Sequence, residues 1–183
     1  MAKKDKGRRG PPKSQQPAQK ARKPSPKLTH SISIIVFAIL SVLFWRKIVL
    51  PGHLIYATDQ ITAGLLFRQF ETWAFRTFHQ FPLWDPYIFA GIPFLAGQHA
   101  DLFYPTSLLR LIFPPYLVLN WNFIIHTFLA GLFMYVFLLS LGLKRVTSFI
   151  VGVSYMFAGT LASLAYSGHD SKVIVASLLP DLE

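Results

Sequence analysis

The chain contains no cysteine among its 183 residues. This absence excludes a disulfide framework and a metal site built on thiolates. Charge is the second shortage, because only 14% of the residues are charged, whereas a soluble domain of this size usually carries about 25%. Hydrophobic residues make up 52% of the chain. This balance favours a membrane protein over a soluble one.

The positive charge is concentrated in the N-terminal tail. Residues 1–27 hold ten Lys or Arg and one acid, whereas the rest of the chain holds eight Lys or Arg and seven acids. The tail has no aromatic residue to stack on a base, and it is too polar to fold alone. Because an apolar run follows, we expect residues 1–28 to be a disordered cytoplasmic tail that contacts anionic lipid headgroups, with no nucleic-acid partner.

Three apolar segments are predicted to cross the bilayer. A hydrocarbon core of roughly 30 Å needs about 20 apolar residues in a helix. Residues 116–143 and 146–166 reach this length, and residues 29–47 reach it when the basic flanking side chains extend toward the headgroups. Residues 173–183 are interpreted as the start of a truncated fourth helix. The predicted fold class is therefore an all-α polytopic membrane protein.

The placement of Lys and Arg predicts the orientation of these spans. Cytoplasmic connections carry an excess of basic residues. The tail and the short turn Lys144-Arg145 both fit this rule, so the N-terminus is expected in the cytoplasm. The loops 48–115 and 167–172 then share the extracytoplasmic side of the membrane.

The loop 48–115 is rich in proline, glycine and aromatic residues. Within it, residues 61–78 contain no proline and mix apolar and polar residues at helical spacing. One face holds Leu65, Leu66, Phe70, Trp73, Ala74 and Phe78, and the other holds Arg68, Gln69, Thr72 and Arg76. This pattern predicts an amphipathic helix in the membrane interface, with its apolar face in the lipid and its polar face away from it.

Small residues recur every four positions in the third predicted span. One stripe contains Ser154, Ala158 and Ala162, and another contains Ser148 and Gly152. Small side chains at this spacing let helices approach closely. We expect the Ser154 stripe to face neighbouring helices.

Residues suited to chemistry gather in the two extracytoplasmic loops. The long loop holds Asp59, Asp85, His99 and Asp101, and the short loop holds His169, Asp170, Ser171 and Lys172. An acid-bearing, aromatic-rich loop is where a membrane enzyme would build a site. We therefore expect Asp59 and the His169-Asp170 pair to open into one cavity.

These residues also have structural interpretations. Asp59 precedes the predicted interfacial helix and could be its N-cap. Asp85 precedes a proline in an arrangement typical of turns, and the His169-Asp170 pair could be a polar turn. His99 and Asp101 are two positions apart, which suits a ligand pair but is weak evidence for a metal.

Several runs of the sequence resemble a known family. Residues 81–94, FPLWDPYIFAGIPF, are similar to the FPLWNPYIFGGMPF signature of the YfhO-like bacterial membrane proteins. Residues 101–105, DLFYP, resemble the ALFYP continuation of that family, and residues 168–172, GHDSK, resemble the loop after its third helix. Leu50-Pro51-Gly52 with Asp59-Gln60 is similar to the stretch after its first helix.

This resemblance implies a GT-C-type membrane glycosyltransferase fold in the bacterial cytoplasmic (inner) membrane. Such enzymes transfer a sugar from a polyprenyl-phosphate carrier to an acceptor in the cell envelope. In that fold the first extracytoplasmic loop carries an essential acid, and Asp59 is the matching position. Family members usually have many more spans, so the resemblance implies that this chain is an N-terminal fragment that is inactive alone.

Glycosyl transfer would give each candidate a role. Asp59 would be the catalytic base that accepts the proton of the acceptor hydroxyl. His169 and Lys172 would bind the departing lipid phosphate and stabilise its charge. The other predicted substrate-binding residues are Asp170, Asp101, His99 and Asp85. No cofactor is assigned, and the need for a divalent metal is left open.

Two other classes of protein compete with an enzyme. A non-catalytic membrane scaffold or assembly factor for the cell envelope is the closer alternative. A transporter is expected to place charges or broken helices within its spans. Here the candidate residues lie in the loops, which disfavours transport.

Overall fold

The structure is a computed structural model that describes residues 26–55, 57–97, 101 and 103–178. The fold is mostly helical, as the sequence predicts. Its elements in chain order are α1 Pro26–Phe44, the π-helix η1 Gln60–Gly64, α2 Leu65–Phe78, β1 Trp84–Asp85, β2 Ile92–Pro93, the 3-10 helix η2 Ser107–Leu111, α3 Pro115–Ser140, α4 Arg145–Met156, α5 Gly159–Ser167 and α6 Asp170–Leu178. Strands β1 and β2 pair antiparallel in a short hairpin that the sequence does not predict.

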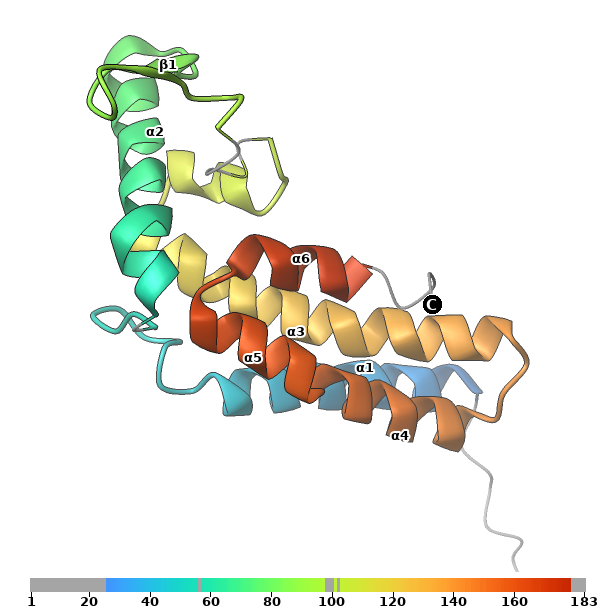
Figure 1. The fold of residues 1–183 in the computed structure, drawn as a ribbon. Helices are drawn as coiled ribbons and strands as arrows, with labels where there is room; N and C mark the ends of the chain where they lie inside the picture. The colour runs from blue at the N-terminus through green and yellow to red at the C-terminus, as the bar shows by residue number, and fades with distance from the viewer. Residues whose placement is uncertain (1–25, 56, 98–100, 102, 179–183) are drawn as a thin grey trace, which may run out of the picture.

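Helix α3 is the centre of a helical bundle (Figure 1). It packs against α1, α4 and α6, and α5 continues in the direction of α4. The largest set of buried apolar side chains consists of Ile48, Leu119, Phe123, Ala130, Leu161, Ala165 and Val173. The end of α1, the start of α3, the end of α5 and the start of α6 meet at one end of the bundle (Figure 1). The segments that follow α1 and α5 are therefore neighbours.

Within the described residues, two helical segments are long and apolar enough to cross a membrane. They are Pro115–Ser140 and Arg145–Ser167, the second of which combines α4 and α5. The apolar part of α1, His30–Phe44, is shorter. The start of α1 and the turn between α3 and α4 lie at the same end of the bundle (Figure 1). Length and composition thus favour a membrane location for the bundle, with these two connections on one side of it.

The third predicted span is divided into two helices. Helix α4 ends before Phe157, Ala158 adopts extended backbone angles, and α5 starts at Gly159. Glycine and threonine, the first two residues of α5, are weak helix formers, so a break costs little free energy here. The predicted polar loop 167–172 is also shorter than expected, because α6 already begins at Asp170.

The small residue at which α4 approaches α3 closely belongs to the Ser148/Gly152 stripe and not to the predicted Ser154 stripe. Ser154 and Ala162 are exposed, so the prediction for the Ser154 stripe is wrong in the described part of the chain. The break between α4 and α5 divides that stripe between two helices. Gly152, from the other stripe, is buried against α3, where a Cβ atom would lie 2.9 Å from the backbone oxygen of Gly131 and 3.0 Å from the Phe37 ring.

A methyl group at position 152 is therefore expected to separate α4 from α3. Gly152→Ala should lower the free energy of unfolding by about 1–3 kcal/mol, because overpacking against backbone is hard to relieve. Ser154→Ala changes an exposed position of the same helix and should stay within about 0.5 kcal/mol of the parent. Denaturant titration in detergent micelles measures both, and equal stability of Gly152→Ala and the parent would contradict this packing.

Helix α2 stands across the end of the bundle and carries the hairpin near its far end (Figure 1). With η1 it covers residues 60–78, close to the predicted 61–78. Leu66, Trp73 and Phe78 of the apolar face are exposed, as expected for a helix that faces lipid. Arg68 and Thr72 of the polar face are buried, because this part of the face meets partners from other parts of the chain.

Candidate functional site

A cavity of about 370 Å³ lies between the start of α2 and the turn that joins α5 to α6. Its charged and amide-bearing lining residues are Asp59, Gln60, Arg68, His169, Asp170 and Lys172. Asp59, His169, Asp170 and Lys172 were predicted from the sequence. The structure therefore brings the two predicted polar segments into one cavity.

Gly168 determines how closely these two segments approach. It ends α5 with a φ of 91°, in the left-handed region that glycine adopts without strain. A Cβ atom at this position would lie 2.9 Å from the backbone nitrogen of Gln60 and 3.0 Å from the side chain of Ala57. Because glycine has no side chain, the turn that carries His169 can rest against the start of η1.

Asp59 and His169 form the accessible part of the site. Asp59 Oδ2 lies 3.3 Å from His169 Nδ1, and the two side chains are 52% and 36% exposed, respectively. Asp59 occupies the N-cap position of η1 but has helical backbone angles and makes no capping hydrogen bond through its side chain. The N-cap interpretation of Asp59 is therefore wrong. Its carboxylate is held beside an imidazole and remains open to a ligand.

Gln60 is a site residue that the sequence analysis missed. Its side chain is fully buried, and among the described residues neither Nε2 nor Oε1 finds a hydrogen-bond partner. A buried amide without a partner is rare and costs free energy. The same residue begins the π-helix η1, and such widened turns frequently occur at functional sites. Gln60 thus offers the cavity a donor and an acceptor.

Behind the cavity, a buried charged cluster joins α2, η2, α6 and the segment at Asp101. Arg68 donates to Asp170 at 2.6 Å and to Asp101 at 3.0 Å. Arg110 donates to the same oxygen of Asp101 at 3.0 Å and to Glu71 at 2.9 Å. All five side chains are at most 10% exposed. Asp101 and Asp170 are therefore tied into the wall of the site rather than free within the cavity.

The cluster contains more carboxyl groups than guanidinium groups. Burial alone would raise the pKa of Asp101, but Arg68 and Arg110 together hold it below its ordinary value. Burial raises the pKa of Asp170 despite its ion pair with Arg68. Burial likewise raises the pKa of Glu71 to about 7, because the pair with Arg110 offsets only part of the lost solvation and Asp101 adds repulsion. With two arginines facing three carboxyl groups, protonation of one carboxyl group restores neutrality.

The raised pKa of Glu71 predicts a pH-dependent effect of Glu71→Gln. The carboxyl group titrates near pH 4.5 when the chain is unfolded and near pH 7 when it is folded. The free energy of unfolding of the parent therefore falls as the pH rises from 4.5 to 7, and it stays constant above pH 7. Glutamine does not titrate. We expect Glu71→Gln to gain about 3 kcal/mol relative to the parent between pH 5 and pH 8, measured by denaturant titration. A difference that is constant with pH would contradict this.

The remaining predicted site residues lie apart from the cavity or outside the described residues. Asp85 is buried in β1, and its Oδ1 accepts a hydrogen bond from the backbone of Tyr87 at 2.9 Å. This is the turn arrangement that the sequence left as the alternative for Asp85. His99 lies outside the described residues.

The site contains no ready metal centre in the described ranges. Across residues 26–55, 57–97, 101 and 103–178, no group of three or more His, Asp or Glu side chains is close enough to hold an ion. Asp59 and His169 are the two potential ligands that face each other in the cavity.

Comparison with known proteins adds no assignment. No protein-family model, curated protein or solved structure matches the chain. The function must therefore be argued from the site and from the motifs of the sequence.

Proposed function

We propose that this chain belongs to a membrane glycosyltransferase of the GT-C type, which transfers a sugar from a polyprenyl-phosphate carrier to a cell-envelope acceptor. The observation that carries the proposal is the cavity in which an accessible carboxylate, Asp59, lies 3.3 Å from His169 and shares a lining with Lys172. This combination provides a base for a hydroxyl, and a cation beside an imidazole for a phosphate. The resemblance of residues 81–94 and 168–172 to the YfhO-like family supports the same assignment.

The proposed reaction uses each group for one step. As the acceptor oxygen forms its bond to C1 of the donor sugar, Asp59 accepts the hydroxyl proton. The bond between C1 and the phosphate oxygen breaks, and the lipid phosphate leaves with the electron pair. Lys172 and His169 stabilise this leaving group. Arg68 is not available for that role, because its guanidinium already donates to Gly64, Asp101 and Asp170.

The position of the site suits a lipid-linked donor. The cavity lies at the end of the bundle where α1 and α5 end, opposite the Lys144-Arg145 turn. We place this end on the extracytoplasmic side, because basic connections remain in the cytoplasm. Helix α2 crosses this end and exposes Leu66, Trp73 and Phe78, which suits a helix in the membrane interface.

Thiol labelling tests this orientation cleanly, because the chain has no cysteine of its own. Thr77→Cys adds a thiol at an exposed position of α2, and Lys144→Cys adds one at the exposed α3–α4 turn. In intact cells, a membrane-impermeant maleimide should label Thr77→Cys and should label Lys144→Cys only after lysis. The reverse pattern would place the cavity in the cytoplasm and contradict the proposed reaction.

A scaffold without catalysis is the second candidate. It is favoured by the observation that Asp101 and Asp170, both predicted to bind substrate, are paired with Arg68 in the buried charged cluster. The test is donor consumption. Membranes containing the complete transferase to which this chain is proposed to belong should release labelled sugar from a polyprenyl-phosphate donor faster than membranes without it. Unchanged donor in both would favour the scaffold.

A further inference from the structure

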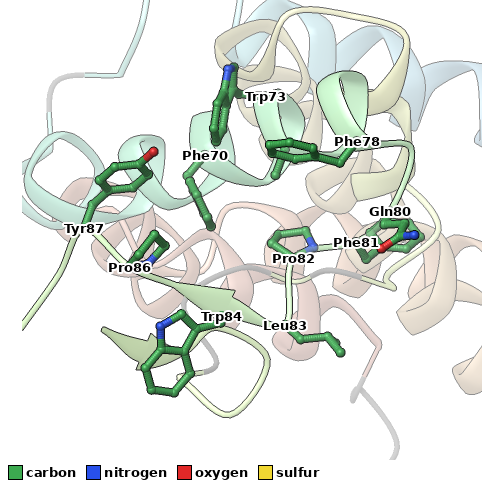
Figure 2. A pocket seen from close by; sticks show the side chains of 11 residues that line it. Phe70, Trp73, Phe78, Gln80, Phe81, Pro82, Leu83, Trp84, Pro86 and Tyr87 are labelled. Carbon is green, nitrogen blue, oxygen red and sulfur yellow. The ribbon is translucent and has the colours of Figure 1, made fainter. Parts of the chain in front are cut away.

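A second cavity, of about 480 Å³, lies between α2 and the segment that includes the β1–β2 hairpin. Figure 2 shows Phe70, Trp73 and Phe78 from α2 on one side and Trp84 with its neighbours on the other. Gln80 and Tyr87 complete the lining at its edges. The volume falls within the range of about 300–1,000 Å³ that is typical of small-molecule sites. This aromatic pocket is separate from the Asp59 cavity, with no lining residue in common.

Aromatic contacts and a strained turn build the pocket. The Trp73 ring contacts those of Phe70, Phe78 and Tyr87, with centroids 5.9, 5.6 and 6.4 Å apart, respectively. Across the pocket, Gly91 lies so close under the indole of Trp84 that a Cβ atom would be 2.5 Å from the ring.

The hairpin turn itself is unusual. Phe89 and Ala90 have φ angles of 50° and 60°, and Gly91 N donates to the carbonyl oxygen of Ile88 at 2.8 Å. Residues other than glycine seldom adopt such angles, and they do so where the surrounding structure enforces them. Here the turn allows the backbone of Gly91 to pass beneath Trp84, and so holds the indole at the wall of the pocket.

The chemistry of the lining restricts the ligand. Among the residues that the structure describes, no Lys, Arg, His, Asp or Glu lines the pocket, so this lining offers nothing to neutralise a phosphate or a carboxylate. Polar atoms are nevertheless present, namely the Gln80 amide, the two indole nitrogens and the Tyr87 hydroxyl. Within the described part of the chain, none of these atoms has a protein partner. The pocket therefore combines apolar ring faces with unpaired donors and acceptors.

We propose that the aromatic pocket binds a neutral sugar unit. A pyranose ring has an apolar C–H face that packs on indole and phenol rings, and its hydroxyl groups can pair with Gln80 and the ring-edge polar atoms. An isoprenoid chain would cover these polar atoms without pairing them, at a cost in free energy. Neutral sugar is thus the class of ligand that satisfies both parts of the lining.

The pocket is too far from Asp59 to hold the sugar that reacts. Asp59 and Trp73 are 14 positions apart in mostly helical chain, which corresponds to about 20 Å. A glycan that occupies both places must contain several units. We therefore assign the aromatic pocket to a distal unit of an oligosaccharide acceptor. This acceptor role rests on the proposed function, whereas the binding of neutral sugar does not.

Sugar binding can be measured on the full chain in phospholipid nanodiscs, which avoid the sugar headgroups of maltoside detergents. The probes are neutral trisaccharides of glucose, galactose and N-acetylglucosamine, with saturation-transfer NMR and tryptophan fluorescence as readouts. At least one probe should bind, and Gln80→Ala and Trp84→Ala should each weaken it about tenfold. Gln80 is exposed, so its removal should leave the fold intact.

Phe89→Ala is the matched control. Phe89 is 90% exposed on the same hairpin and does not line the pocket, and its neighbour Ala90 already adopts a similar backbone angle. This variant should bind the sugar like the parent. The proposal is overturned if no trisaccharide binds, if Gln80→Ala and Trp84→Ala bind like the parent, or if farnesol competes for the pocket better than sugar. Sugar binding without donor consumption would support the pocket and overturn only the proposed transfer.

Discussion

Asp59→Asn is expected to lower the rate of sugar transfer by roughly two or more orders of magnitude, which is the contribution typical of a general base. Asparagine cannot accept the proton of the acceptor hydroxyl, but it keeps the size of the side chain. The Asp59 side chain makes no capping hydrogen bond and is half exposed, so the substitution should leave the fold unchanged. The measurement is label transfer from a polyprenyl-phosphate donor in membranes that contain the complete transferase to which this chain is proposed to belong, together with a denaturant titration.

Asp85→Asn is the matched control for this experiment. It makes the same chemical change in a carboxylate of the same loop, but Asp85 is held in a turn by the backbone of Tyr87 and does not line the cavity. Asparagine can accept the same hydrogen bond, so transfer should remain near the parental rate. Near-parental transfer by Asp59→Asn would show that Asp59 is not the base. Equal losses in both variants would point to a general defect of the loop.

Sequence patterns were sufficient for the long helices and for the meeting of the two polar segments. Apolar runs in α3 and in α4 with α5 are long, and the topology they imply returns the chain to the same end of the bundle after α1 and α5. Asp59 and His169 are therefore neighbours. The break at Ala158 was missed because hydropathy stays high across it, and the hairpin was missed because its strands are only 2 residues each.

The buried charged cluster could not be derived from the sequence. Helical periodicity correctly separated Arg68 from the apolar residues of α2, but periodicity does not tell which face is buried. The partners of Arg68 lie 33 and 102 residues further along the chain, and no local pattern connects them. The usable signal was the presence of Arg68, Glu71 and Arg110 in an apolar, aromatic-rich region, where charged residues are expected to be paired.

Arg68→Ala is expected to cause the largest loss of stability among single substitutions in the site, about 3–5 kcal/mol. Arg68 is 2% exposed and its guanidinium donates to Asp101, Asp170 and the Gly64 carbonyl oxygen. Removing it leaves buried carboxylates with less positive charge around them. Arg76→Ala is the control on the same helix, because Arg76 is exposed and its guanidinium donates to backbone oxygens at 3.3 Å. It should cost less than about 1 kcal/mol.

The pH dependence separates lost charge pairing from lost packing. The arginines lower the pKa of Asp101 in the folded chain. This carboxylate therefore stabilises the fold above its unfolded pKa of 3.8. The stabilisation is lost as the pH falls through the folded pKa. The deficit of Arg68→Ala should therefore be large at pH 7 and shrink toward pH 4, where orphaned carboxyl groups bind protons. A deficit of the same size at both pH values would indicate packing alone.

A double-mutant cycle with Asp170→Ala provides the decisive control for the Arg68 pair. If the two side chains stabilise the fold through their 2.6 Å ion pair, Asp170→Ala should destabilise the Arg68→Ala variant clearly less than it destabilises the parent. In the Arg68→Ala variant the buried carboxylate of Asp170 has already lost its partner, so its removal costs less free energy. High salt should reduce this coupling free energy far less than it reduces the coupling of an exposed ion pair, because the cluster is shielded from solvent ions. Strictly additive losses would show that Arg68 and Asp170 act independently, and that Asp170 is not held in place by α2.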